Sequence, residues 1–300
     1  MSRRLSWLTY VMLNFTRQRL AATKDVWQAR LDFDSSARFA RVAPYLLHLV
    51  EPGNPDLHWL SVRRRDADRV ILYFHGGAYV MGNPRTHLAP LSRLAKLTGM
   101  QIVVPEYRLA PGHPAPAAFE DAVSAHQTLL KKGHAPGNII LGGDSAGGGL
   151  ALALLADLCA RDLRPAGLFA WSPWTDFAMT GDSLQRNASI DPALPIGRMV
   201  ETVDLVLSGF PANDPRISPL YAHFIAPPPV FLQVGGEEIL QDDSLRMAEV
   251  LRAAGGCVTC DIWKGCPHVW QMLDGYVPEA RAALVATAAF IHALLPIARR

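Results

Sequence analysis

The feature that most constrains the fold is a regular alternation of short apolar segments with longer segments of helical periodicity. The short segments are rich in β-branched and aromatic residues and are bounded by turn residues, as strands are. A β-α-β order of this kind requires parallel strands joined by helical crossovers, so helices cover both faces of the sheet. The sequence therefore predicts an α/β fold with a mostly parallel central sheet of about eight strands.

The predicted elements can be assigned to residue ranges. The strands cover residues 43–52, 56–64, 69–77, 101–108, 138–145, 166–174, 230–238 and 258–263. Helices are predicted at 5–20, 25–38, 117–132, 147–162, 243–256 and 279–295. Residues 182–215 break the alternation with several prolines and a helical stretch near 197–209, which is typical of an insertion. We therefore expect an α/β core formed by 41–181 and 216–300, to which residues 1–40 and the insertion are added.

Composition excludes several classes of protein. Half of the 300 residues are hydrophobic and the net charge is +2, so a large buried core is expected and a nucleic-acid partner is not. No segment has the roughly 20 consecutive apolar residues of a membrane span. The four cysteines do not make a disulfide framework in a chain of this length. Cys257 and Cys260 have CxxC spacing but fall in a predicted strand, whereas redox pairs of that type open a helix.

The N-terminal segment has two interpretations. Residues 1–15 combine basic residues with an apolar stretch, as an export signal does. Polar residues interrupt the apolar run, however, and no clean cleavage site follows it. Apolar residues recur instead at helical spacing, at Trp7, Tyr10, Val11 and Phe15. We therefore predict an amphipathic helix and a cytoplasmic protein.

The strand at 138–145 runs into the sequence GGDSAGG, in which Gly143 and Gly147 flank Ser145. The pattern G-x-S-x-G between a strand and a helix predicts a nucleophile elbow, a strained turn that exposes the serine hydroxyl. The flanking glycines leave room for neighbouring backbone. The N–H of Ala146 then lies at a helix start, where it can bind a developing oxyanion. A phosphate-binding loop would require G-x-x-x-x-G-K-[ST], and no such lysine follows.

A second motif, His75-Gly76-Gly77, ends the strand at 69–77. In esterases an HGGG-type loop at this place supplies backbone N–H groups to the tetrahedral oxygen. Here Ala78 takes the fourth position, which we expect to be tolerated because Gly76 and Gly77 supply the N–H groups. Taken alone, the motif would be read as an ordinary turn after a strand.

Together these motifs resemble those of the bacterial hormone-sensitive lipase family of α/β-hydrolases. The matching stretches are HGGAYV, YRLAPGHPAPAAFEDA, GDSAGGGL, SPWTD, VGGEEILQDDS and HVW, in the family's order, from about residue 40 to the C-terminus. The resemblance implies a carboxylesterase for short- to medium-chain acyl esters. Two residues depart from the pattern, since Gly112 replaces a common glutamate and Ala115 replaces a bulky residue. Neither departure touches the expected triad.

A serine nucleophile requires a base and an acid that orients the base. In this fold the acid follows a late strand and precedes the histidine in the chain. The strand that begins at Val230 leads into four carboxylates, Glu237, Glu238, Asp242 and Asp243. The resemblance implies Glu238 as the acid, with Asp242 as the second candidate. Asp242 and Asp243 are also well explained as caps of the following helix.

The chain order favours His268 as the base, because it comes after Glu238 and just past the strand at 258–263. His292 comes later but falls inside the closing helix. The expected mechanism is a two-step acyl transfer that requires neither a metal nor an organic cofactor. Ser145 is the nucleophile, and the oxyanion is bound by Gly76, Gly77 and Ala146.

Residues 1–40 and 182–215 resemble the two pieces of the family's cap over the site. The expected lining of the substrate pocket comprises Trp7, Tyr10, Val11, Phe15, Tyr107 and Trp174. The four residues of the first helix have an alternative role, which is to pack the cap onto the core. Asp191 resembles a cap position of the family, without a role that the sequence reveals. The expected partner is a small-molecule ester, and a homodimer is a further expectation that the apolar closing helix would suit.

Two other functions compete with the carboxylesterase. An amidase-like relative, such as an arylformamidase, uses the same triad. A non-catalytic binding protein is the alternative from another class, since the gibberellin receptors resemble this fold and have lost the triad histidine. The presence of His268 argues against that second alternative.

Overall fold

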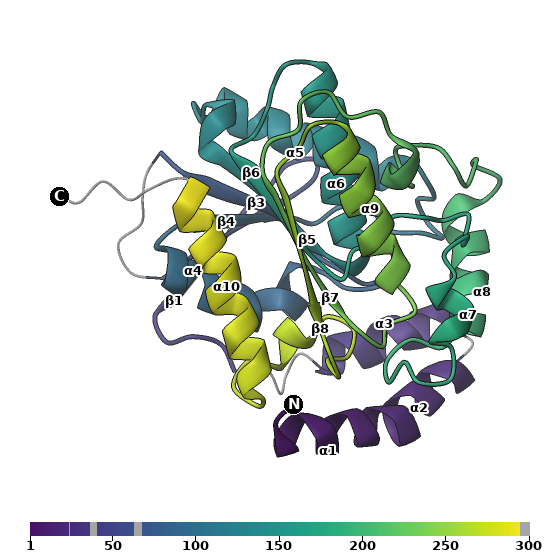
Figure 1. The fold of residues 1–300 in the computed structure, drawn as a ribbon. Coiled ribbons are helices and arrows are strands. Elements are labelled where there is room, and N and C mark those ends of the chain that lie inside the picture. The colour runs from purple at the N-terminus through teal and green to yellow at the C-terminus, as the bar shows by residue number, and fades with distance from the viewer. Residues whose placement is uncertain (24, 37–40, 63–67, 295–300) are drawn as a thin grey trace.

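The computed structural model describes residues 1–23, 25–36, 41–62 and 68–294. These residues form one eight-stranded sheet in the order β1-β2-β4-β3-β5-β6-β7-β8 (Figure 1). The β1–β2 and β2–β4 pairs are antiparallel and the other neighbours are parallel, which confirms the predicted sheet. The strands are β1 (Leu46–Glu51), β2 (Leu57–Val62), β3 (Val70–Phe74), β4 (Gln101–Pro105), β5 (Ile139–Asp144), β6 (Gly167–Trp171), β7 (Val230–Gly235) and β8 (Val258–Trp263).

Alternate side chains of β3 enter two different cores, because successive residues of a strand point to opposite faces. Ile71 and Tyr73 pack with residues of α4 and α10. Leu72 and Phe74 pack with residues of α5, α6 and α9 on the other face. The central strands are thus buried on both sides, which explains their continuous apolar sequences. The covering helices are α4 (Leu88–Thr98), α5 (Ala117–Lys131), α6 (Ser145–Ala160), α9 (Gln241–Ala253) and α10 (Pro278–Leu294).

Helix α4 is missing from the sequence-based assignment. Its sequence contains Pro90, which is compatible with the helix because it lies in the first turn. Gly99, in the left-handed conformation with φ 69°, ends the helix. The predicted element ends at residues 38, 64 and 295 lie outside the described residues.

The N-terminal segment and the insertion meet at one end of the molecule. Helix α2 lies beside α8 (Figure 1), and the guanidinium of Arg17 donates to the carbonyl oxygen of Ala188. The two segments expected to form a cap therefore contact each other. The N-terminal elements are α1 (Arg3–Val11), a π-helical turn (Met12–Thr16), α2 (Arg17–Ala22) and α3 (Val26–Ser36). The insertion contributes α7 (Ser183–Arg186) and α8 (Ile196–Leu207).

Candidate active site

Ser145 lies at the tight turn between β5 and α6, at the carboxyl edge of the sheet where ligands of such folds bind. Its φ of 51° is in the left-handed region, which is a strained conformation for a residue with a side chain. A Cβ at Gly143 would lie 2.3 Å from the carbonyl oxygen of Gly147, and a Cβ at Gly147 would lie 2.1 Å from that of Phe74. The turn therefore requires both glycines of the G-x-S-x-G pattern.

Three side chains from separate loops form one hydrogen-bonded chain at this turn. Nε2 of His268, in the loop after β8, lies 2.9 Å from Oγ of Ser145. Nδ1 of the same ring lies 2.7 Å from Oε2 of Glu238, in the loop after β7. A neutral ring that accepts the Ser145 O–H at Nε2 carries its proton at Nδ1 and donates it to Glu238. This geometry allows proton transfer from Ser145 to His268.

Glu238 is fully buried and is fixed by further bonds to its second carboxylate oxygen. Oε1 accepts the hydroxyl of Ser172 at 2.7 Å and the N–H of Gly235 at 2.6 Å. Ser172 also accepts the N–H of Val269, next to the histidine, at 3.2 Å. Sequence reasoning missed the role of Ser172, although it lies in the matched SPWTD stretch. It links the acid to the loop that carries the base.

The environment of His268 sets its pKa. Burial acts to lower the pKa, but the charge of Glu238 and the hydrogen bond to it outweigh burial, so the net shift is upward from 6.5. The carboxylate of Glu238 therefore increases the affinity of the His268 ring for a proton, as a general base requires.

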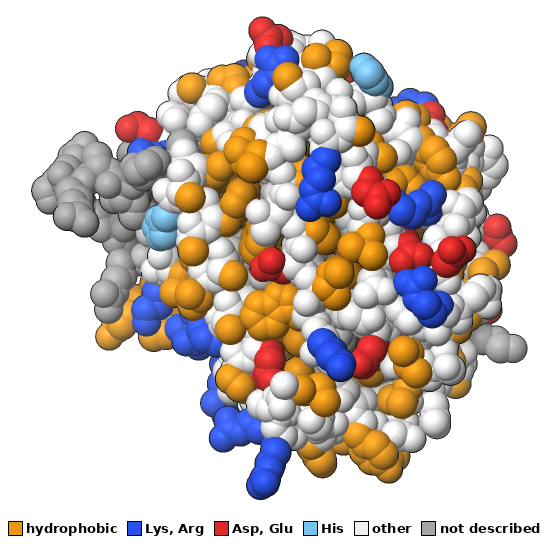
Figure 2. All heavy atoms as spheres, in the orientation of Figure 1, with side chains coloured by type: hydrophobic (Ala, Val, Ile, Leu, Met, Phe, Trp, Pro, Cys, Tyr) orange, Lys and Arg blue, Asp and Glu red, His pale blue; other side chains and the backbone are white. Residues whose placement is uncertain are grey.

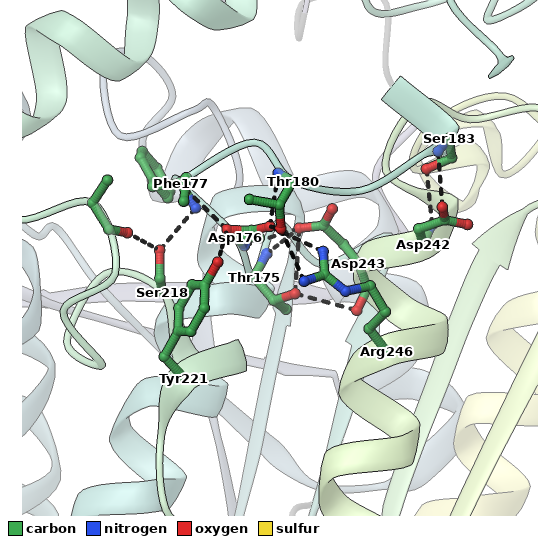
Figure 3. A network of polar contacts seen from close by, with 12 residues as sticks. Thr175, Asp176, Phe177, Thr180, Ser183, Ser218, Tyr221, Asp242, Asp243 and Arg246 are labelled. Atoms are coloured by element: carbon green, nitrogen blue, oxygen red, sulfur yellow. Dashed lines mark hydrogen bonds and ion pairs between the residues drawn. The ribbon is translucent and has the colours of Figure 1, made fainter. Parts of the chain in front are cut away.

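Asp242, the second candidate for the acid, points to a different part of the molecule. Its carboxylate accepts the N–H of Ser183 at 2.8 Å (Figure 3), and it pairs with Arg186 at 2.8 Å. Its own N–H donates to the hydroxyl of Ser183 at 3.0 Å. Asp242 thus anchors the first turn of the insertion and makes no bond to His268.

The insertion also holds the loop of the acid. Asn187 donates its side-chain N–H to the carbonyl oxygen of Glu238 at 2.8 Å. Asp191, which is fully buried, accepts the N–H of Ile239 at 2.8 Å with one carboxylate oxygen. The other oxygen of Asp191 accepts two N–H groups of its own loop, at Ala193 and Leu194. Asp191 therefore has a structural explanation that its sequence context did not supply.

The predicted oxyanion loop differs from the expectation at Gly76. Its N–H donates to Oδ1 of Asp144 at 2.8 Å, so Gly76 is not available to bind an oxyanion. A Cβ at Gly76 would lie 2.2 Å from Oδ2 of the same carboxylate, which explains why glycine is required there. The error arose because the motif shows which residues form the loop and not which N–H is already bonded inside the protein.

The N–H groups of Gly77 and Ala78 come next in this loop, and neither has a hydrogen-bond partner among the described residues. The N–H of Ala146 lies in the first turn of α6, where N–H groups have no partner within the helix. Gly77 has φ 120° and Ala78 has φ 56°. Ala78 is thus a candidate donor that sequence reasoning treated only as a tolerated substitution.

Asp144 is the centre of a buried network beneath the loop. Its carboxylate accepts the hydroxyl of Tyr73 at 2.7 Å and lies 3.2 Å from Nε2 of His87. Burial acts to raise the pKa of Asp144, but His87, Tyr73 and the Gly76 N–H together lower it below 3.8. These three groups thus keep the carboxylate of Asp144, the residue before the nucleophile, ionised.

Tyr107 and Trp174 were expected to line the pocket, and the structure instead buries both in the core, at 2% and 1% exposure. The Tyr107 ring stacks on His75 with centroids 4.3 Å apart, and its hydroxyl donates to the carbonyl oxygen of His75. The backbone N–H of Trp174 donates to the carbonyl oxygen of Ser145 at 2.9 Å. The Tyr107 side chain thus supports the oxyanion loop, and the Trp174 backbone supports the elbow.

The aromatic residues of the first helix lie on the outer surface. Trp7, Tyr10 and Phe15 are 67%, 64% and 66% exposed, and Val11 is half-buried. The three aromatic side chains therefore do not pack this segment onto the core. Leu5 does so instead, since it is the one residue of α1 that is fully buried.

The described residues also bear on metals and membranes. No group of three or more His, Cys, Asp or Glu side chains among them is arranged to hold a metal ion. Cys257 and Cys260 are both free; Cys260 lies in the edge strand β8, and Cys257 directly precedes that strand. No helix in this part of the chain has the length and apolar character needed to traverse a bilayer.

Comparison with known proteins identifies the family. Residues 71–272 match a family described as having the alpha/beta hydrolase fold. The chain is 36% identical to an acetyl-hydrolase from Streptomyces hygroscopicus over 81% of its length and 82% of that protein. It is 38% identical to an esterase from Acinetobacter venetianus over 76% of each.

The solved structures agree with the sequence matches. The crystal structure of an esterase from the bacterial hormone-sensitive lipase family superposes with a TM-score of 0.92 at 35% identity, over 98% of this chain and 99% of that one. From its sequence and its fold, the chain belongs to the bacterial hormone-sensitive lipase family of α/β-hydrolases.

Proposed function

We propose that the protein is a carboxylesterase that hydrolyses short- to medium-chain acyl esters through an acyl-enzyme on Ser145. The observation that carries the proposal is the unbroken hydrogen-bonded chain from Ser145 through His268 to Glu238. The esterases and the acetyl-hydrolase among its relatives support the same reaction class.

In the first step, Oγ of Ser145 attacks the ester carbonyl carbon while Nε2 of His268 takes the hydroxyl proton. Glu238 stabilises the imidazolium that forms and keeps the ring in its orientation. The negative charge that develops on the carbonyl oxygen is bound by the N–H groups of Gly77, Ala78 and Ala146. These N–H groups do not have to move during the reaction, because the turn and the helix start already hold them in position.

His268 then gives its proton to the leaving alkoxide, which departs as the alcohol and leaves Ser145 acylated. A water molecule attacks the acyl carbon while Nε2 of His268 takes a proton from it. Collapse of the second tetrahedral intermediate releases the carboxylic acid and returns the proton to Ser145. The two steps consume one water and release one alcohol and one acid.

The test is hydrolysis of p-nitrophenyl esters from acetyl to palmitoyl, beside an N-formyl arylamine. Activity that peaks at short or medium acyl chains supports the carboxylesterase. Preference for the formyl amide would assign the same triad to an amidase. A folded protein that turns over neither substrate would contradict an enzymatic function of this site.

A further inference from the structure

Helix α1 presents an aromatic face that no other part of the described chain covers. Trp7 and Tyr10 are 67% and 64% exposed, and their spacing places them on the same side of the helix. Large aromatic side chains usually lie inside a protein or at an interface, because their exposure to water is unfavourable. Two of them on one exposed helical face therefore require an explanation other than packing.

The same face is basic. Residues 1–23 contain no aspartate or glutamate, and two of their four arginines, Arg3 and Arg4, lie in the first turn of α1. Arg3 lies four residues before Trp7, so it shares the aromatic side of α1, and Arg3 and Arg4 are both exposed. In Figure 2, Lys and Arg side chains and hydrophobic side chains lie together along the lower edge, where Figure 1 places α1. We call Arg3, Arg4, Trp7 and Tyr10 the α1 face.

An open depression adjoins the basic end of this face. It has a volume of about 370 Å³ and lies between the start of α1 and the start of α10. Its charged lining consists of Arg3, Arg4, Arg281 and one carboxylate, Asp274. Asp274 is already paired with Arg93 at 2.9 Å and with Arg281 at 2.7 Å. The depression therefore carries excess positive charge of a kind that suits a phosphate group.

We propose that the α1 face binds the surface of an anionic phospholipid bilayer. The helix would lie in the plane of the headgroups, with Trp7 and Tyr10 inserted at the boundary with the acyl chains. Arg3 and Arg4 would face the lipid phosphates, and the depression would hold one of them. Charge complementarity selects an anionic bilayer over a neutral one.

The charge also argues against a second copy of this chain as the occupant. In a two-fold symmetric dimer the same patch contacts itself, so Arg3 and Arg4 of both copies would meet. No carboxylate in residues 1–23 would offset that repulsion, and the nearby Glu279 is already bonded to the N–H and hydroxyl of Ser2. An anionic lipid surface turns the same charges into a favourable interaction.

The position of α1 gives the binding a consequence for the site. Leu5, on the inner side of the helix, belongs to a buried cluster with Cys266 and Trp270. Those two residues flank His268 in the loop after β8. Helix α1 thus packs against the catalytic loop through Leu5, and the α1 face lies on the outer side of the same helix. Binding would therefore bring the site next to esters dissolved in a membrane.

The experiment is co-sedimentation of the protein with vesicles, which does not depend on a functioning Ser145. Vesicles of phosphatidylglycerol and phosphatidylcholine in equal parts are compared with phosphatidylcholine alone, at low and high ionic strength. We expect binding to the mixed vesicles that weakens with salt. We expect Trp7→Ser/Tyr10→Ser to weaken it roughly tenfold or more, because the inserted apolar area is lost. We expect Arg3→Gln/Arg4→Gln to weaken it about 25-fold, since each arginine near an anionic surface contributes about fivefold.

Two matched variants control for general effects. Leu47→Ser/Leu49→Ser removes side chains of β1 that are 53% exposed, and Arg161→Gln/Arg252→Gln removes two exposed arginines, one directly after α6 and one in α9. Both should bind like the wild type, and all variants should unfold at the wild-type temperature. The proposal is overturned if the wild type does not bind the mixed vesicles, or if the α1 variants bind as well as the controls. Concentration-dependent self-association that Trp7→Ser/Tyr10→Ser abolishes, without vesicle binding, would assign the face to a dimer instead.

Discussion

Oδ1 of Asp144 accepts the N–H of Gly76 at 2.8 Å, and this bond joins the residue before the nucleophile to the loop proposed to bind the oxyanion. Both residues are buried, and the same carboxylate accepts the Tyr73 hydroxyl. The position of the next two N–H groups, at Gly77 and Ala78, therefore depends on a side chain that takes no part in the proposed proton transfers.

Removal of this carboxylate should impair turnover more than substrate binding. We expect Asp144→Ala to lower kcat about 100-fold with a small change in KM, similar to the loss of one oxyanion donor. Asp144→Asn keeps one acceptor oxygen, so its kcat should lie between those of Asp144→Ala and the wild type. Steady-state kinetics on a soluble ester and a thermal unfolding curve provide the measurement. A folded Asp144→Ala protein with wild-type kcat would show that the loop is positioned without this bond.

The assignment of the acid can be tested with two carboxylates that lie four residues apart. Glu238→Ala should lower kcat about 10³- to 10⁴-fold, because the imidazole loses both its orientation and the stabilisation of its charged form. Asp242→Ala is the matched control, since its bonds go to Ser183 and Arg186, and it should cost less than about tenfold. The reverse order of effects would move the acid to Asp242.

The pH dependence of kcat/KM should reflect the raised pKa of His268. Only the neutral imidazole can accept the Ser145 proton, so activity should be lost as pH falls through the pKa of this group. The acidic limb should therefore lie above 6.5, the ordinary value for histidine. Glu238→Gln removes the charge that raises the pKa, and the residual activity should show its acidic limb at lower pH. Profiles from weakly acidic to weakly basic pH test this, and identical limbs in the two proteins would contradict it.

A second titration should appear in stability rather than activity. Burial raises the pKa of Asp243 from 3.8 to about 7 in the folded protein, where it accepts the N–H groups of Thr175 and Asp176 (Figure 3). Between these two values the folded state holds a proton that the unfolded state has lost, so stability falls as pH rises toward 7. The effect is at most about 4 kcal/mol by linkage.

Asp243→Asn mimics the protonated carboxyl and should lack this dependence. Urea unfolding of both proteins at several pH values measures the difference in their unfolding free energies. The unfolding free energy of the variant should rise relative to that of the wild type as pH rises from about 4 to about 7, and the difference should then level off. A difference that stays constant across that range would show that Asp243 does not titrate there.

The elements that the sequence predicted well are those with strong local patterns. The strands of the sheet and the turn at Ser145 follow from apolar runs and from glycines that no other residue can replace. Chain order sufficed to select His268 among the ten histidines as the base candidate, and the structure brings that ring to Ser145.

The remaining features depend on contacts between distant segments. The bond from Gly76 to Asp144 spans 68 residues, and the link from Ser172 to Glu238 spans 66. No periodicity in the sequence encodes such pairs, so the wrong N–H was assigned to the oxyanion site and the support of the acid was missed. The burial of Tyr107 and Trp174 likewise depends on the path of the loops that carry them, and the sequence does not show that path.

The most direct test of the proposed function is the turnover of Ser145→Ala beside the wild type on p-nitrophenyl butyrate. The substitution removes one hydroxyl from a buried side chain, so the variant should keep the wild-type unfolding temperature. We expect its kcat to fall by a factor on the order of 10⁴ or more, to the level of background hydrolysis. A folded Ser145→Ala protein that hydrolyses the ester at the wild-type rate would show that Ser145 is not the nucleophile.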